Sequence, residues 1–440
     1  MAGWTLTELP RHNRAVLFDG APPSAMTDEL AGEILPGLPA PENLPAPEAK
    51  RLLVLLGFVG ASVARHRQER DPAFREDPER AFDGVRVGPA QTPFRQYFAG
   101  LAERTGTGHY HRDSYASLVR WNVGTTYVRW REETLAVLPG AFDDGAVRTY
   151  AGAVGEVRFF ELVKKGEAVE LAINGMLQPL SDGTVEFDSV DGISRAVAAT
   201  ALLDALRQLF REFVALPDDE GMTPEYFMDV FRQFAVHWSR DDIPPSGALD
   251  PEALKRDFLL GISLPGYASH VRRIFPALLA AERVALEGLA GRPPLPVMLL
   301  RALDIVPAGG PADASAVPET KEILAGLPVA HLRDLMVRHP ALGVWYRLLV
   351  AHARASGAHL QLSKRFLFKP QAQRDSTGIG DAELVSNRRG TTGMDESLLE
   401  RLTRARKDHV LSCLRVPAGE TAEPTDPPAD SSALVRIGER

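Results

Sequence analysis

The chain has 440 residues, 45% of them hydrophobic, which is enough apolar material for one large domain or for two smaller ones. A net charge of −8, with acidic and basic residues interspersed, argues against binding to nucleic acid or to anionic membrane surfaces. A single cysteine, Cys413, excludes a disulfide framework and favours a reducing compartment, and no signal-peptide pattern opens the chain, so we expect a cytoplasmic protein.

The first 150 residues predict a small domain of helices with one short strand. Helical patterns occupy residues 49–67, 93–104 and 114–121. An apolar run at residues 52–63 is too short to span a bilayer. β-Branched and aromatic residues favour a strand over residues 125–131. The turn sequence Asp143-Asp144-Gly145 precedes the domain boundary, which we expect after residue 150.

Helices dominate the rest of the chain. Their patterns lie at residues 159–177, 193–216, 225–238, 252–260, 271–289 and 296–304. Two helices begin with an N-cap residue followed by proline, at Thr223-Pro224 and Asp250-Pro251. We therefore expect a mainly α fold, with a large helical domain at residues 151–415 and a disordered, Pro-rich tail at residues 416–440.

The last long helical pattern carries histidines on its apolar face. This face repeats every three or four residues and consists of Trp345, Leu348, His352, Ala355, His359, Leu362 and Phe366. Pro370 predicts the end of the helix, and the polar residues 371–389 predict a mobile loop that closes over a site. A histidine in such a stripe is either a core residue or a metal ligand. A neutral imidazole that faces an apolar slot suits the proximal side of a haem iron.

The segment from residue 358 to residue 395 resembles the C-terminal signature of the indoleamine 2,3-dioxygenase family. The matching parts are the His-Leu-Gln motif at His359, Pro370, and the turn Gly390-Thr391-Thr392-Gly393-Met394-Asp395. The resemblance implies a mainly α, two-domain fold with a smaller N-terminal α(+β) domain. It also implies haem b between the domains, with His359 as the iron ligand and with Thr392 in a turn that closes the site. The family's pyrrolnitrin-pathway branch shares a similar helix.

A second match covers residues 224–238, which resemble the family's segment of a phenylalanine followed by an arginine and a tryptophan. The resemblance implies that Phe227 stacks on the indole ring of the substrate and that Arg232 binds its carboxylate. On an α-helix, residues five apart lie about 140° apart, so we expect these two side chains to flank the ligand. Without the resemblance, the position of Arg232 among aromatic residues favours a structural role, in an internal ion pair or at an edge of the protein that is exposed to solvent.

Shorter matches extend the implied substrate site. The sequence Phe159-Phe160 resembles a family segment on the distal side of the haem, which implies that Phe159 lies against the indole. Val163 stands where the family often has a hydroxyl or an imidazole. Residues 115–121 resemble a helix under the distal pocket, and Tyr115, Leu118 and Val119 would form its apolar walls.

Two further residues are implied as partners of the haem. Ser269 follows Gly266 in the region that corresponds to a family loop beside the haem. Ser356 stands where the family has an arginine three residues before the proximal histidine, so one expected partner of a haem propionate is missing. Arg354 is the replacement that we expect from the sequence.

The resemblance implies a monomeric haem-dependent dioxygenase. Such an oxidoreductase inserts O₂ across the indole C2–C3 bond of tryptophan or a related indole, gives an N-formylkynurenine-type product, and needs no protein base. One alternative is different chemistry on a modified indole at the same haem. The other is a non-catalytic haem or gas-binding protein, which Val163 would favour. A His109-Tyr110-His111 alternation could supply two metal ligands on a strand, but it lacks a third, which favours a turn.

Overall fold

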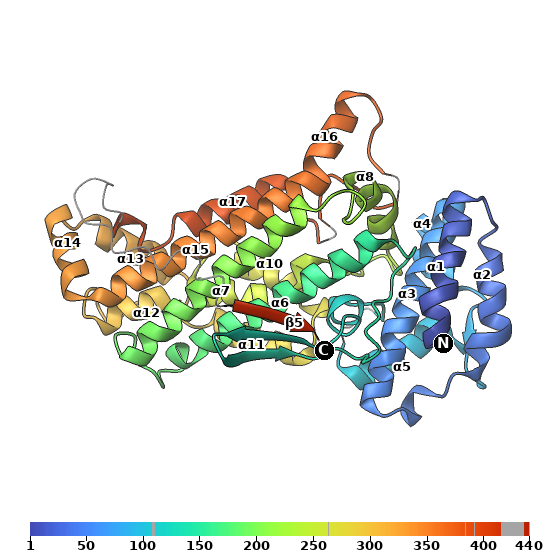
Figure 1. Ribbon diagram of the computed structural model, residues 1–440, viewed down its shortest axis with the longest axis horizontal. Coiled ribbons are helices and arrows are strands. Elements are labelled where there is room, and N and C mark those ends of the chain that lie inside the picture. The colour runs from blue at the N-terminus through green and yellow to red at the C-terminus, as the bar shows by residue number, and fades with distance from the viewer. Residues whose placement is uncertain (108–110, 263, 383, 391, 415–434, 440) are drawn as a thin grey trace.

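The computed structural model describes residues 1–107, 111–262, 264–382, 384–390, 392–414 and 435–439. The protein is mainly helical, as the sequence predicts (Figure 1). In the part of the chain that is described, no helix has both the length and the apolar character needed to cross a bilayer.

The N-terminal helices gather at one end of the molecule (Figure 1). They are α1 (Ala2–Phe18), α2 (Ser24–Glu29), α3 (Ala46–Arg70), α4 (Ala73–Glu76) and α5 (Phe94–Thr105). Helix α3 is longer than the sequence predicts and buries nearly every residue from Leu52 to Ala64. It therefore lies inside the fold, and its glycines allow neighbours to approach: a Cβ added at Gly60 would lie 2.3 Å from the indole of Trp238.

Four long helices lie side by side and form the centre of the molecule (Figure 1). They are α6 (Val154–Ser181), α7 (Val190–Ala215), α15 (Pro340–Ser363) and α17 (Glu396–Lys407). Shorter helices cover them, namely α8 (Pro224–Tyr226), α9 (Pro251–Leu260), α10 (Tyr267–Ile274), α11 (Ala280–Ala290), α12 (Leu295–Ala302), α13 (Ala316–Ala325) and α14 (Val329–Arg338). The two N-caps expected from the sequence are confirmed, because the Thr223 and Asp250 side chains accept hydrogen bonds from the first backbone N–H groups of α8 and α9.

The strands form two small antiparallel sheets. Strands β1 (Arg86–Val87) and β2 (Thr92–Pro93) pair with each other. The second sheet has the order β4-β3-β5, from Thr126–Trp130 (β3), Glu133–Leu138 (β4) and Val435–Glu439 (β5). Strand β3 is the strand predicted near residues 125–131. Strand β5 corrects the expectation of disorder for residues 435–439, because their backbone groups find partners on β3; residues 415–434 lie outside the described part of the chain.

The predicted helix end at Pro370 is wrong. Helix α15 continues through a π turn, Lys364–Phe368, into α16 (Lys369–Ser376), which contains Pro370 in its first turn. Proline lacks an N–H and normally clashes with the preceding α-helical turn, but Pro370 directly follows the π turn, where the α-helical hydrogen-bond pattern is already interrupted. The polar segment that follows is thus partly helical, and α16 projects from the body of the molecule (Figure 1).

Candidate functional site

His359 borders a cavity of about 180 Å³ between α6, α7, α15 and α17. The apolar part of the wall consists of Phe159, Leu162, Val163, Leu206, Phe210, Leu254, Leu362, Leu399 and Leu402. The Phe210 ring lies beside the imidazole, with the ring centroids 5.5 Å apart. This face of α15 is thus the apolar stripe expected from the sequence.

The imidazole of His359 is available to a ligand. Its side chain is exposed and borders the cavity, and desolvation by the surrounding protein atoms lowers its pKa to about 4. Among the described residues, neither ring nitrogen has a hydrogen-bond partner. A neutral imidazole with a free nitrogen lone pair is the form that binds a metal ion.

His352 lies two helical turns before His359 on the same stripe, and it has a structural role. Its Nε2 lies 3.3 Å from Oδ1 of Asp257, and the side chain is buried. Burial lowers the pKa of His352 to about 4, although the bond to Asp257 opposes this. His352 is not among the described residues that line the cavity, so of these two histidines only His359 is presented to it.

The opposite part of the cavity wall is charged and is organised by Asp257. Arg406 of α17 donates to Oδ2 of Asp257 at 2.6 Å, and the Tyr267 hydroxyl donates to the same atom at 2.6 Å. Arg406 also donates to Oγ of Ser356 at 2.6 Å. Burial raises the pKa of the Asp257 carboxyl, but Arg406 and its other partners outweigh this effect and hold it well below its usual value. Arg406 thus carries the positive charge next to Ser356, where the family resemblance expects an arginine.

A second ion pair extends the charged wall. Arg256 donates to Oε1 of Glu170 at 2.7 Å, and both side chains are buried and line the cavity. Burial raises the pKa of Glu170 to about 7, against the opposing effect of Arg256. The cavity therefore has one apolar wall with a free imidazole and one wall of paired charges.

A smaller cavity of about 100 Å³ adjoins the first. Its wall includes four of the residues expected in the indole pocket, Tyr115, Leu118, Val119 and Phe227. Phe159, Val163 and Gly247 line both cavities. These three residues therefore form the partition between the His359 cavity and the smaller cavity.

Arg232 supplies the positive charge of the smaller cavity. It is 8% exposed, and its Nη2 donates to the backbone carbonyls of Ser386, at 2.8 Å, and of Arg389. Its buried Nε has no hydrogen-bond partner in the part of the chain that the structure describes. Burial lowers the pKa of Arg232 to about 10, which leaves it charged at neutral pH. A buried guanidinium that is held by carbonyls and lacks an ion pair within 4 Å among the described residues can accept an anion.

Phe227 and Arg232 share one cavity because their helix is not an α-helix. Residues Phe227–Phe231 form a π turn, in which the N–H of Arg232 donates to the carbonyl of Phe227, and a 3₁₀ turn, Arg232–Phe234, follows. A bond between residues five apart brings them onto one side of the helix. The two side chains therefore line the same cavity, whereas α-helical geometry predicted that they would lie on different faces and flank a ligand. The rings of Phe159 and Phe227 also lie close together, with 5.6 Å between their centroids.

Three expected site residues lie elsewhere. Ser269 borders a separate hollow with Pro265, Arg273 and Leu398. Arg354 lines an outer groove on the far side of α15. Thr392 borders another hollow, next to Gly393, and its buried Oγ1 has no hydrogen-bond partner among the residues that the structure describes. Of the described residues in the same turn, only Met394 borders the His359 cavity.

The loop that does border both cavities was not expected from the sequence. Gly247 lines both, Ser246 lines the smaller one and Ala248 the larger one. The Ser246 hydroxyl accepts a hydrogen bond from the N–H of Ala248, which fixes the loop before α9. The run Pro244-Pro245-Ser246-Gly247 is a strong loop signal that could have directed attention here instead of to Ser269.

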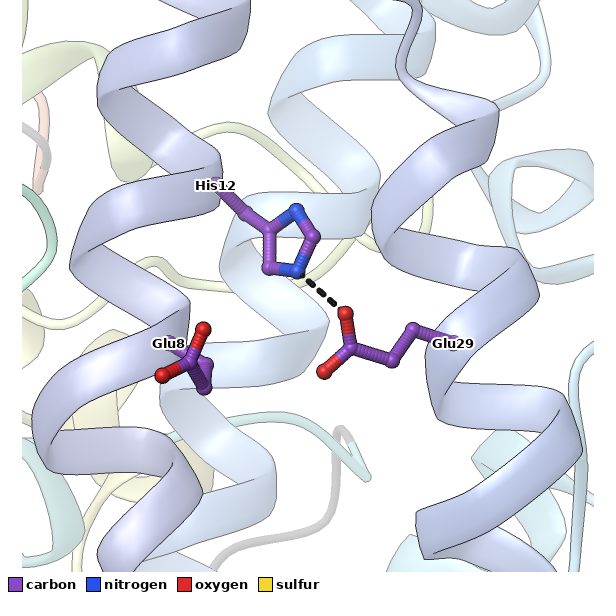
Figure 2. Close-up of side chains that lie close together, drawn as sticks. All are labelled: Glu8, His12 and Glu29. Atoms are coloured by element: carbon purple, nitrogen blue, oxygen red, sulfur yellow. Dashed lines mark hydrogen bonds and ion pairs between the residues drawn. The ribbon is translucent and has the colours of Figure 1, made fainter.

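A second group of possible metal ligands joins α1 and α2 (Figure 2). Nε2 of His12 lies 2.7 Å from Glu29, which also accepts from the indole of Trp4 at 2.6 Å. Glu8 pairs with Arg11 at 2.7 Å. Because Arg11 and the indole already satisfy the carboxylates, we interpret this group as a network that ties α1 to α2. His109, of the expected histidine pair, lies outside the described residues.

Comparison with known proteins finds no family model and no curated protein that matches this chain.

Proposed function

We propose that the protein is a haem-dependent dioxygenase that acts on tryptophan or a related indole, with a two-domain, indoleamine 2,3-dioxygenase-like arrangement. The observation that carries the proposal is the unpartnered imidazole of His359 in a largely apolar cavity that adjoins a second cavity with a buried arginine. The first provides a site for a flat, apolar metal complex, and the second provides a site for an amino acid with an aromatic side chain.

The residues of the His359 cavity fit haem in their chemistry. One neutral imidazole would ligate the iron, and Arg406 and Arg256 are the cations that could bind its two carboxylates. The cavity volume of about 180 Å³ is below the 300–1,000 Å³ typical of sites for drug-sized ligands. Loading therefore requires the walls to separate, and the Asp257–Arg406 pair on the polar side would have to open. When bound, haem would supply the oxygen chemistry.

The remaining residues would orient the substrate and exclude water. Arg232 would bind the carboxylate with its guanidinium, since the charge is buried and has no ion pair among the described residues. Phe159 and Phe227 would hold the indole ring between aromatic faces. Val163, at the partition, offers no hydrogen bond and keeps the contact between the two cavities dry. No proton acceptor from the protein is required.

A second candidate function is a haem or gas-binding protein without turnover. It is favoured by Val163, which cannot hydrogen-bond to a ligand of the iron, and by Arg232, which already donates to two backbone carbonyls. Different chemistry on a modified indole is compatible with the same residues.

The test is haem binding by purified His359→Ala. Wild type should take up one haem and show the spectrum of a histidine-ligated iron, whereas His359→Ala should fold but fail to retain stoichiometric haem. His352→Asn is the matched control on the same helix, and it should keep the histidine-ligated spectrum at the cost of stability. A full haem complement with an unchanged spectrum in His359→Ala would contradict the proposal. Oxygen uptake with L-tryptophan then separates the enzyme from the haem carrier.

A further inference from the structure

A groove of about 1,050 Å³ runs between α7 and α15 on the outer side of Phe210. These two helices lie side by side in Figure 1. Helix α7 contributes Thr200, Asp204, Arg207 and Arg211, and helix α15 contributes Arg347, Val350, Arg354 and Gln361. The α7 residues recur every three or four positions, and with Gly357 the α15 residues do so as well, so each helix presents one continuous stripe to the groove. Lys407, at the end of α17, also lines it.

The groove gathers positive charge on a protein of net charge −8. Its five cationic side chains are Arg207, Arg211, Arg347, Arg354 and Lys407. None of the five has an ion pair or a hydrogen bond from its side chain to any residue that the structure describes. Asp204 also lines the groove and attracts Arg354 and Arg207 electrostatically, so the described lining holds five cations against one carboxylate.

The floor of the groove is apolar and partly aromatic. It includes Phe210, Val214, Ala351 and Ala358, with Tyr346 at one end. His409 also lines the groove and is 5% exposed, and its buried Nδ1 has no hydrogen-bond partner among the described residues. Its ring contacts Tyr346 edge to face, with 5.6 Å between centroids.

We propose that this groove binds a small organic anion that carries at least two negative groups on a flat apolar body. Cations on both walls match two separated negative groups, because a single charge would engage only one wall. The apolar floor favours an organic body over a fully hydrated inorganic ion. The site goes beyond the proposed oxygenase function and does not depend on it, since the Phe210 ring separates the groove from the His359 cavity.

The experiment is calorimetric titration of the full chain with three probes that differ in one property each. Naphthalene dicarboxylate has both features, succinate has two charges with little apolar surface, and the dimethyl ester of the naphthalene compound has the apolar body without charge. The naphthalene dicarboxylate should bind most tightly, and its affinity should fall with added salt. Adenosine diphosphate, titrated in parallel, shows whether phosphate or carboxylate groups are preferred.

The variant Arg211→Gln/Arg354→Gln removes one cation from each wall and should weaken binding of the naphthalene dicarboxylate about tenfold. The matched control Arg86→Gln/Arg240→Gln removes two unpaired arginines outside the groove and should leave binding unchanged. The proposal is overturned if neither aromatic anion binds, if the control weakens binding equally, or if succinate or the ester binds as tightly as the best aromatic anion. Loss of haem from His359→Ala has no bearing on these results, so the two proposals fail separately.

Discussion

Replacement of Arg232 by glutamine tests the link between the smaller cavity and a substrate carboxylate. In wild type the guanidinium is 8% exposed, borders the cavity and donates to the carbonyl of Ser386. Glutamine retains a donor for that carbonyl but removes the charge. The expected result is selective loss of affinity for L-tryptophan, whereas tryptamine, which has no carboxylate, should bind almost as before.

The magnitude follows from the burial of the group. A hydrogen bond to a charged partner contributes about 1.5–3 kcal/mol when solvent is excluded. Each 1.4 kcal/mol is a factor of ten, so Arg232→Gln should weaken the binding of L-tryptophan by about 10- to 150-fold relative to tryptamine. The unpartnered Nε supports the upper part of this range, because a carboxylate could engage two donors of the guanidinium at once.

Arg65 provides a matched control for this measurement. It is 2% exposed, donates to the carbonyl of Val230 at 2.6 Å, and burial lowers its pKa to about 10, as it does for Arg232; unlike Arg232, it also forms an ion pair with Glu69 at 3.6 Å. It lines neither of the two cavities. Arg65→Gln should therefore destabilise the fold without changing the ratio of the two affinities.

The assay is a spectral titration of the haem-loaded protein with L-tryptophan and with tryptamine, for wild type and both variants. The reasoning is refuted if Arg232→Gln weakens both ligands equally, since Arg232 would then only hold the loop at Ser386. It is also refuted if wild type prefers tryptamine, because the buried cation would then have no carboxylate to bind.

Two predictions concern stability. Gly60→Ala should cost about 1–3 kcal/mol in urea unfolding, because the new methyl group meets the Trp238 ring, whereas Gly175→Ala, with nothing within 4 Å, should be neutral or stabilising by up to about 1 kcal/mol. The pKa of His352 is lowered by burial from 6.5 to about 4, so the unfolded chain binds the proton first as the pH falls. The free energy of unfolding should therefore fall between pH 6.5 and pH 4, by about 3 kcal/mol from this residue; a profile that is equally steep in His352→Asn would exclude it as the cause.

Local signals in the sequence predicted the fold well where they act through neighbouring residues. The caps at Thr223 and Asp250 depend only on the first backbone N–H groups of each helix, and both are present. The single helix expected over residues 271–289 is instead two, α10 and α11, because Pro276 and the residues around it form a separating 3₁₀ turn. The π turns were not predictable, because no residue pattern distinguishes them from α-helix before the tertiary contacts are known.

In the candidate site, too, the features set by neighbouring residues were predictable and those set by tertiary contacts were not. His359 and its apolar neighbours follow from the helical repeat, and the structure brings them to a cavity. Arg406 could not be identified in this way, because it reaches Ser356 from another helix and the two are far apart in sequence. Arg354 is close to His359 in sequence but points to the opposite side of α15, into the groove. Sequence distance from a motif is thus a poor guide to which cation faces the cavity.

Strand β5 has a consequence for how this protein is made. Thr126 of β3 pairs with Glu439, so this strand receives its second neighbour from a segment about 300 residues later in the sequence. While the ribosome is still synthesising the long helices, β3 has only β4 beside it, and its other edge presents unpaired N–H and C=O groups. The nascent chain therefore carries an open edge until β5 has been synthesised, and a product that stops before residue 435 keeps that edge and with it a tendency to associate with other chains.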